Sequence, residues 1–186
     1  MIKISNLEQI KNINLDENKI FYIYGKIGSG KTYFSKNIVK INNKKALYTS
    51  FYDIIHASAQ GEELQIEDKE VIIIDDEIKT VIEKEFSCLS LQRILEKMQN
   101  DGKVLLIITS LSPKKLKEKN KHLAEFVLKG EQIEICYDIE NRTKIAEEYS
   151  KQSKTIINKN VLQSIAKENN IGKIKGRINQ LKIQYY

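Results

Sequence analysis

The sequence is short of the residues that mark several classes of protein. Its 186 residues contain no tryptophan, one proline and two cysteines, and no segment approaches the roughly 20 apolar residues of a membrane-spanning helix. Cys88 and Cys136 lie far apart without a Cys-x-x-Cys spacing, which argues against a disulfide framework or a zinc site. The first residues lack an apolar signal core. We therefore expect a cytoplasmic protein that does not associate with membranes.

Arginine is also scarce, since only Arg93, Arg142 and Arg177 occur, and lysine supplies most of the net charge of +6. The positive charge gathers near the C-terminus, where residues 151–186 contain eight basic residues and one acidic residue, Glu168. A basic region of this kind predicts contact with a polyanion such as nucleic acid. Charge counting does not show which face carries these side chains, so a solvated lysine-rich surface remains the alternative.

Short apolar segments alternate with helical patterns along the first two thirds of the chain. Strands are predicted at residues 20–24, 46–50, 71–74, 104–108 and 132–136. The third and fourth are continuously apolar, as expected of strands buried on both faces of a parallel sheet. Helical spacing relates Phe34, Ile38 and Ile41, and again Leu91, Ile94, Leu95 and Met98. This alternation predicts an α/β fold with a five-stranded parallel sheet flanked by helices.

The pattern is helical from residue 137 onward. Asp138 is a suitable N-cap for a helix that runs to about Lys151, a second helix is expected near Asn160, and a third from Ile171. We therefore divide the chain into an α/β nucleotide-binding body, residues 1–136, and a small all-helical lid, residues 137–186. The lid is too small to be stable alone and should dock on the body.

The motif that indicates nucleotide binding is GKIGSGKT, Gly25 to Thr32, which matches G-x-x-x-x-G-K-[ST] and lies between a predicted strand and a predicted helix. Its glycines let successive backbone N–H groups point at phosphate oxygens, and the following helix adds its positive end. Lys31 should neutralise the β- and γ-phosphates, and Thr32 should place its hydroxyl on Mg²⁺. The predicted nucleotide-binding residues of this stretch are Gly25, Gly28, Ser29, Gly30, Lys31, Thr32 and Tyr33.

Acidic and hydroxyl side chains follow two other predicted strands. In VIIIDDE, Asp75 should hold Mg²⁺, and Asp76 or Glu77 should orient or deprotonate the attacking water. The strand VLLII is followed by Thr109 and Ser110, at the end of a parallel strand that faces the ligand crevice. Ser110 is therefore predicted to contact the γ-phosphate or the water. The alternative is that the hydroxyls here only cap the next turn.

Several segments in order resemble the AAA+ module of the bacterial replication initiator family DnaA. They are FYIYGKIGSGKTYF, ALYTSFYDI, VIIIDDE, LQRILEKMQNDGKVLLIITSLSPKKL, GEQIEICYDIENRTKIAEEY and GKIKGRINQLK. We expect the chain to carry the AAA+ module only, without the DNA-binding domain of DnaA, a layout similar to that of the DnaA regulator Hda. The resemblance implies ATP or ADP with Mg²⁺ as cofactors, and a role in replication initiation or its regulation. It also implies DnaA or another AAA+ protein as partner, and it adds the sliding clamp as a candidate.

Two positions depart from the pattern of this family. The family places an arginine finger just before the final strand, and residues 121–130 contain no arginine. Because such a finger contributes about 10³ to 10⁵ in rate, the resemblance implies slow ATP hydrolysis or none. The sensor arginine of the last lid helix aligns with Gly172, so Lys173 or Arg177 is the predicted replacement.

Two further functions fit the sequence motif. A helicase-loader-like AAA+ protein would bind single-stranded DNA through the basic C-terminal region. A small P-loop kinase would use the same phosphate-binding loop, but such enzymes usually clamp the transferred phosphoryl group with arginines, which are few here.

Overall fold

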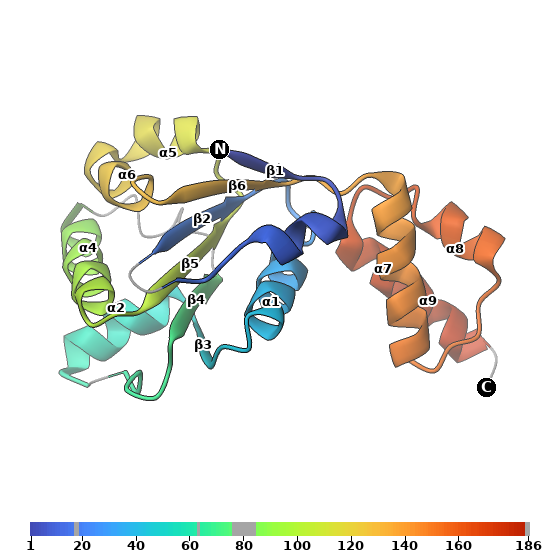
Figure 1. The fold of residues 1–186 in the computed structure, drawn as a ribbon, viewed down its shortest axis with the longest axis horizontal. Coiled ribbons are helices and arrows are strands. Elements are labelled where there is room, and N and C mark those ends of the chain that lie inside the picture. Colours follow the sequence, from blue (N-terminus) through green and yellow to red (C-terminus); the bar gives the residue numbers. More distant parts are fainter. Residues whose placement is uncertain (17–18, 63, 76–84, 185–186) are drawn as a thin grey trace.

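The computed structural model describes residues 1–16, 19–62, 64–75 and 85–184. Its centre is a parallel sheet in the order β1-β6-β2-β5-β4-β3 (Figure 1). The strands are β1 (Ile2–Ile4), β2 (Ile20–Tyr24), β3 (Ala46–Thr49), β4 (Val71–Asp75), β5 (Val104–Thr109) and β6 (Glu131–Ile135). The predicted α/β fold is confirmed, but the sheet has six strands rather than five.

The strand that the sequence did not predict is β1, at one edge of the sheet. It pairs in parallel with β6, and Ile4 lies opposite Ile135. A segment of three residues carries too little periodicity to indicate a strand. Its pairing partner, β6, is the last strand of the body in sequence, so only the tertiary structure brings the two strands together.

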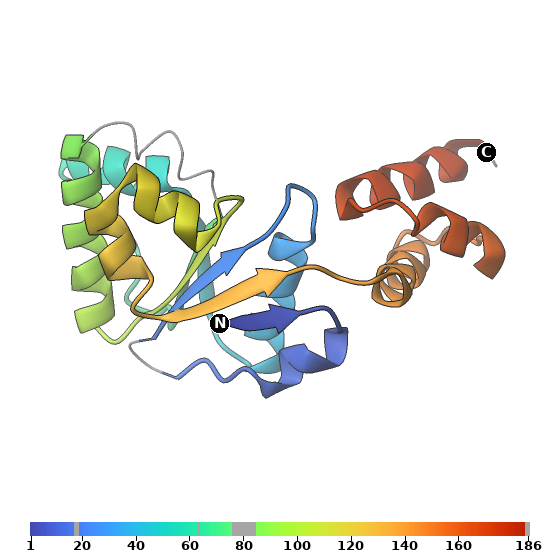
Figure 2. The same cartoon turned by 90° about the horizontal axis from the view of Figure 1, so that it is seen from above.

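Alternate residues of the central strands face two separate cores. Ile23, Ile73 and Leu106 belong to one core, and their neighbours Ile72 and Leu105 belong to the other. The first face is covered by η1 (Leu7–Asn12) and α1 (Lys31–Ile41). The second is covered by α2 (Phe51–Gln60), α4 (Glu85–Asn100), α5 (Pro113–Lys119) and α6 (Lys121–Val127) (Figures 1 and 2). Burial on both faces explains why the central strands are continuously apolar.

The predicted buried face of α1 is correct only in part. Phe34 and Ile38 are fully buried, whereas Ile41 is 48% exposed. Ile41 is the last residue of the helix, so it lies beyond the part of α1 that packs on the sheet. Periodicity predicts which face is apolar but not how far along the helix that face stays covered.

Three helices follow β6 and lie to one side of the sheet, next to α1 (Figures 1 and 2). They are α7 (Ile139–Gln152), α8 (Lys159–Ile165) and α9 (Ile171–Gln184). Asp138 caps α7 as predicted, because its Oδ1 accepts a hydrogen bond of 2.8 Å from the backbone N–H of Asn141. Lid residues Ile145, Leu162 and Ile174 belong to the same apolar cluster as Phe34 of α1. The apolar core of the lid is therefore continuous with that of the α/β body, and a domain boundary after residue 136 stays a prediction.

In the part of the chain that the structure describes, no helix combines the length and the apolar character needed to cross a bilayer.

Candidate functional site

The loop between β2 and α1 has the backbone conformation expected of a phosphate-binding loop. Gly28 has a φ of +76° and Gly30 a φ of +94°, which glycine adopts without the steric cost that a side chain would bring. Gly30 is also the N-cap of α1, so this helix begins with its positive end at the loop. Both features favour an anion at this point of the sheet.

The polar side chains of the loop fit a phosphate chain. Lys31 Nζ donates hydrogen bonds to the carbonyl oxygens of Gly25 (3.0 Å) and Lys26 (2.9 Å), which hold its ammonium group at the loop. The Ser29 hydroxyl is buried and has no hydrogen-bond partner within the described residues. Because buried hydroxyl groups are normally hydrogen-bonded, an oxygen atom of a bound ligand would satisfy Ser29.

Thr32 and Asp75 meet beside this loop. The Thr32 hydroxyl donates a hydrogen bond of 2.7 Å to Asp75 Oδ2, although β4 lies two strands away from β2 in the sheet. Both side chains line an open hollow of about 740 Å³. A hydroxyl and a carboxylate are the ligands that P-loop proteins supply to Mg²⁺, which takes its other ligands from phosphate and water. The pair therefore fits Mg²⁺. No group of three or more His, Cys, Asp or Glu that could hold a metal ion occurs among the described residues.

The far wall of the same hollow comes from the start of α2 and from its neighbours. Ser50 and Asp53 form a capping box, in which the Ser50 hydroxyl donates to Asp53 Oδ2 at 2.7 Å. Lys36 Nζ lies 5.7 Å from the centroid of the Tyr48 ring. Burial, and then the negative charge of Asp75, raise the pKa of Tyr48. The hollow thus combines carboxylates, hydroxyls and one lysine around the Thr32–Asp75 pair.

The structure describes only some of the predicted catalytic residues. Asp76 and Glu77 lie outside the described residues, so their roles stay predictions. Strand register places the end of β5 beside the end of β2, and half-buried Ser110 follows at that edge. The hydroxyl of buried Thr109 accepts a hydrogen bond of 3.1 Å from Leu111 N, so Thr109 caps the following turn. Contact between Ser110 and a phosphate stays a prediction.

The lid contacts the phosphate-binding loop directly. Ile171 N, at the start of α9, donates a hydrogen bond of 2.6 Å to the carbonyl oxygen of Gly28. The Asn170 side chain covers Gly28, because a Cβ atom placed there would lie 2.2 Å from its amide group. The ring of Tyr137, between β6 and α7, lies against Gly30 in the same way, because a Cβ atom placed at Gly30 would lie 3.0 Å from its Cε2 atom. Sequence reasoning missed all three contacts. Asn170 carries the signal of a helix N-cap, which does not indicate what its side chain touches.

Of the predicted lid sensors, Arg177 is engaged elsewhere. Arg177 Nη2 forms an ion pair with Glu168 Oε1 at 2.8 Å within the lid. The side chain of Lys173 is exposed near the start of α9, and its backbone N–H donates to Asn170 Oδ1 at 3.0 Å. Lys173 therefore stays the candidate for a cation that reaches the nucleotide.

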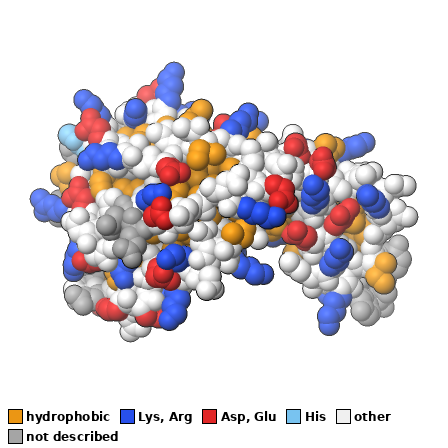
Figure 3. Space-filling model, viewed as in Figure 1, with side chains coloured by type: hydrophobic (Ala, Val, Ile, Leu, Met, Phe, Trp, Pro, Cys, Tyr) orange, Lys and Arg blue, Asp and Glu red, His pale blue; other side chains and the backbone are white. Residues whose placement is uncertain are grey.

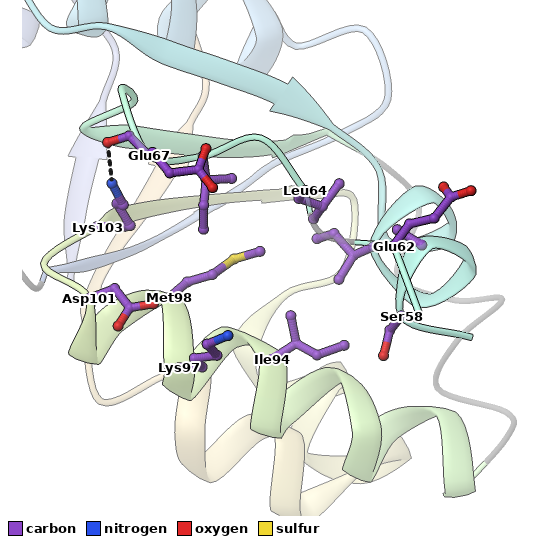
Figure 4. A pocket seen from close by; sticks show the side chains of 12 residues that line it. Ser58, Glu62, Leu64, Glu67, Ile94, Lys97, Met98, Asp101 and Lys103 are labelled. Carbon is purple, nitrogen blue, oxygen red and sulfur yellow. Dashed lines mark hydrogen bonds between the residues drawn. The ribbon is translucent and has the colours of Figure 1, made fainter. Parts of the chain in front are cut away.

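A second hollow, of about 480 Å³, lies between α2 and α4 (Figure 4). Leu64, Ile94 and Met98 form its apolar floor, and charged side chains, among them Lys97 and Asp101, stand at its rim. It contains none of the predicted site residues. The predicted site residues that the structure describes lie instead near the loop after β2, at the carboxyl ends of the strands.

Comparisons with known proteins agree with this geometry. Domain III of the replication initiation protein DnaA from Thermotoga maritima has a TM-score of 0.73 and 22% sequence identity, covering 96% of this chain and 80% of that one. A structure of DnaA bound to AMPPCP and single-stranded DNA has a TM-score of 0.70 and 20% identity, covering 96% of this chain. The DnaC helicase loader has a TM-score of 0.52 and 16% identity, covering 68% of this chain and 83% of that one. At these identities the likeness establishes the fold, which is that of a DnaA-like AAA+ module.

The chain spans 60% of the DnaA chain solved with AMPPCP and single-stranded DNA. A search of curated proteins found no match. The model of the AAA family, described as the ATPase family associated with various cellular activities, matches residues 21–130, which is more than half of the chain and includes the loop, Thr32 and Asp75. The protein therefore belongs to the AAA family of ATPases.

Proposed function

We propose that the protein is a nucleotide-dependent switch that binds ATP or ADP with Mg²⁺ between the α/β body and the lid. The observation that carries this proposal is the 2.7 Å hydrogen bond between Thr32 and Asp75 beside a glycine loop that begins α1. Two parts that lie 43 residues apart in the sequence, the loop with Thr32 and Asp75 at the end of β4, can thus form one site. The contact of the lid with the same loop supports a response of the lid to the bound nucleotide.

Each residue of the site would have a defined role. Lys31 would turn its ammonium group from the loop carbonyls to the β- and γ-phosphates. Loop N–H groups and the Ser29 hydroxyl would donate to phosphate oxygens. Thr32 and Asp75 would hold Mg²⁺, which when bound neutralises charge on the phosphates. Ser110 would contact the γ-phosphate or the attacking water, and Lys173 would approach from the lid.

Hydrolysis is proposed to be slow. Residues 121–130, which span α6 and the turn before β6, contain no arginine to serve as a finger. Lysine cannot replace it fully, because an ammonium group lacks the planar fork that contacts several phosphate oxygens at once. Asp76 or Glu77 would act on the water, if hydrolysis occurs. A protein that holds its nucleotide for long periods suits a regulator better than a motor.

We propose that the bound nucleotide controls association with another AAA+ protein, of which DnaA is the leading candidate. This association would act in the initiation of DNA replication or in its regulation. The likeness to DnaA domain III over 96% of this chain supports a DnaA-type module as partner, because related AAA+ modules present related surfaces. The sliding clamp is a further candidate partner.

A second candidate function is a helicase-loader-like role with single-stranded DNA as ligand. The solved DnaA complex contains single-stranded DNA, and DnaC is a helicase loader. The exposed lysines of the lid, Lys173 and Lys182 among them, favour this reading. Acidic side chains lie among the basic ones on the lid face seen in Figure 3, which weakens it. Oligonucleotide binding that falls steeply with salt would support this second function.

Calorimetric titration with Mg-ATP and Mg-ADP tests the proposal. Lys31→Ala is expected to weaken nucleotide binding by about 10- to 100-fold, the loss of hydrogen bonds between charged groups. Lys40→Ala, an exposed lysine at the other end of the same helix, serves as the matched control and should change nothing. Hydrolysis is then measured with and without DnaA. The absence of binding by the unmodified protein would contradict the proposal.

A further inference from the structure

The lid meets the phosphate-binding loop through the backbone of both segments. Ile171 is the first residue of α9, and its N–H donates to Gly28 O at 2.6 Å. The first N–H groups of a helix have no acceptor within the helix. The N–H of Ile171 is therefore hydrogen-bonded only while the lid contacts the loop, so its protection from exchange measures this contact.

A side chain completes the contact. The Asn170 amide lies over the bare Cα of Gly28, so close that any Cβ there would collide with it at 2.2 to 2.3 Å. The Oδ1 atom of the same side chain accepts the N–H of Lys173 in the first turn of α9. Asn170 thus caps α9 and covers Gly28 at the same time. Ile171 adds an apolar contact, because its Cγ1 would lie 3.2 Å from a Cβ atom at Gly30.

The loop presents different groups to the lid and to a ligand. A phosphate chain is bound by N–H groups of the loop, whereas the lid is bound by one of its carbonyl groups, that of Gly28. This carbonyl shares a planar peptide unit with the N–H of Ser29, which donates to Lys26 O at 3.0 Å, so a phosphate that draws this N–H toward itself turns the Gly28 carbonyl with it. Arg177, in the middle of α9, is paired with Glu168, and the Arg142 guanidinium donates to the carbonyl oxygens of Tyr137 and Ala166, so neither arginine provides this link.

We propose that Gly28 of the phosphate-binding loop, contacted by Asn170 and by the N–H of Ile171, is the element through which the lid senses the bound nucleotide. This inference rests on the proposed function. Phosphate binding orders the loop, strengthens its contact with α9 and holds the lid against the body. A ligand that prefers one of two arrangements shifts the protein toward that arrangement by its difference in affinity.

Amide hydrogen exchange followed by NMR provides the first test. In the full chain, the Ile171 amide is expected to exchange at least 5-fold more slowly when Mg-ADP or Mg-ATP is bound. The amide of Lys159, the first residue of α8, lies outside the contact with the loop and is the internal control. Equal exchange of the Ile171 amide with and without bound nucleotide would overturn the inference.

Two matched substitutions provide the second test. Ile171→Pro removes the N–H donor at the first position of α9, where proline suits a helix. Ile171→Val keeps the donor with a side chain of similar size. We expect Ile171→Pro to bind nucleotide about 5-fold or more weakly than Ile171→Val. Equal affinities would contradict the role of the hydrogen bond.

A third variant tests the inference independently, in case the proline variant does not fold. Asn170→Ser keeps a side-chain oxygen for the cap of α9 but takes the amide away from Gly28. Asn158→Ala removes the cap of α8, whose acceptor oxygen binds Asn160 N at 2.9 Å, and leaves the loop untouched. Weaker nucleotide binding by Asn170→Ser than by Asn158→Ala supports the inference, and the reverse order overturns it.

The tests separate the inference from the proposed function. If the unmodified protein binds neither Mg-ATP nor Mg-ADP, both fail together. If it binds nucleotide while the Ile171 amide and the variant pairs show no difference, the switch has another sensor and only the inference fails.

Discussion

The hydroxyl of Tyr33 donates a hydrogen bond of 2.6 Å to Glu148 Oε2, and so joins the first turn of α1 to α7 of the lid. Tyr33 directly follows Thr32. Lys175 of α9 lies 5.9 Å from the centroid of the Tyr33 ring and 5.1 Å from that of Tyr149. The helix that starts at the phosphate-binding loop is thus linked to two lid helices by one tyrosine.

Tyr33→Phe is expected to destabilise the protein by about 1 kcal/mol, because the substitution removes one hydrogen bond and leaves the Glu148 carboxylate to solvent. Chemical denaturation of both proteins measures the free energy of unfolding. Tyr52→Phe, which removes a hydroxyl from an exposed residue of α2, is the control and should stay within about 0.5 kcal/mol of the unmodified protein. A Tyr33 variant as stable as this control would show that the link contributes nothing.

Tyr137→Phe is expected to leave stability unchanged or to raise it by up to about 1 kcal/mol. The Tyr137 hydroxyl is buried and has no hydrogen-bond partner within the described residues, so burying it costs free energy that phenylalanine avoids. Thermal and urea unfolding at pH 7 measure the change. A clear loss of stability would mean that the hydroxyl has a partner in solution.

Alkaline pH should act through the same residue. Burial, and then the nearby Tyr33, raise the pKa of Tyr137 well above its ordinary value of 10.0. The unfolded chain therefore releases this proton at a lower pH than the folded protein does. Ionisation of Tyr137 therefore lowers the free energy of unfolding only above about pH 10, where the unfolded chain loses the proton that the folded protein keeps. Urea unfolding between pH 8 and pH 11 should show a smaller decline for Tyr137→Phe than for the unmodified protein.

Asp75→Asn and Thr32→Val are expected to remove the effect of Mg²⁺ on nucleotide binding. In the unmodified protein, chelation of Mg²⁺ should weaken ATP binding, and each variant should bind equally with and without the metal. The reason is that these two side chains, which meet at 2.7 Å, are the proposed protein ligands of the ion. Calorimetric titration with and without a chelator measures this, with Asp101→Asn at an exposed position as the control. A Mg²⁺ effect that survives in both variants would place the ion elsewhere.

Asn42→Ala is expected to cost about 2 kcal/mol of stability. Asn42 Oδ1 accepts from Leu15 N at 3.1 Å, and its Nδ2 donates to the carbonyl oxygens of Ile13 (3.1 Å) and Ile38 (2.9 Å). The substitution leaves the backbone groups of the N-terminal segment without these partners. Urea denaturation measures the loss. Asn14→Ala, at an exposed position of the same segment, should be nearly neutral.

The sequence determined the elements whose signal is local. The five strands around the phosphate-binding loop, the cap of α7 by Asp138 and the start of α9 at Ile171 follow from apolar periodicity and capping residues. The loop motif also determined which residues lie between β2 and α1. These features depend on neighbours a few positions apart, so the printed order of residues is enough to predict them.

Only the tertiary structure decided which of these segments touch. It placed Asn170 against Gly28 and Tyr33 against Glu148, and it added β1 to the edge of the sheet beside β6. No local pattern fixes such contacts, because they depend on the order of strands in the sheet and on where the lid comes to rest. The physical reason is that long-range hydrogen bonds form only after the cores have brought distant segments together.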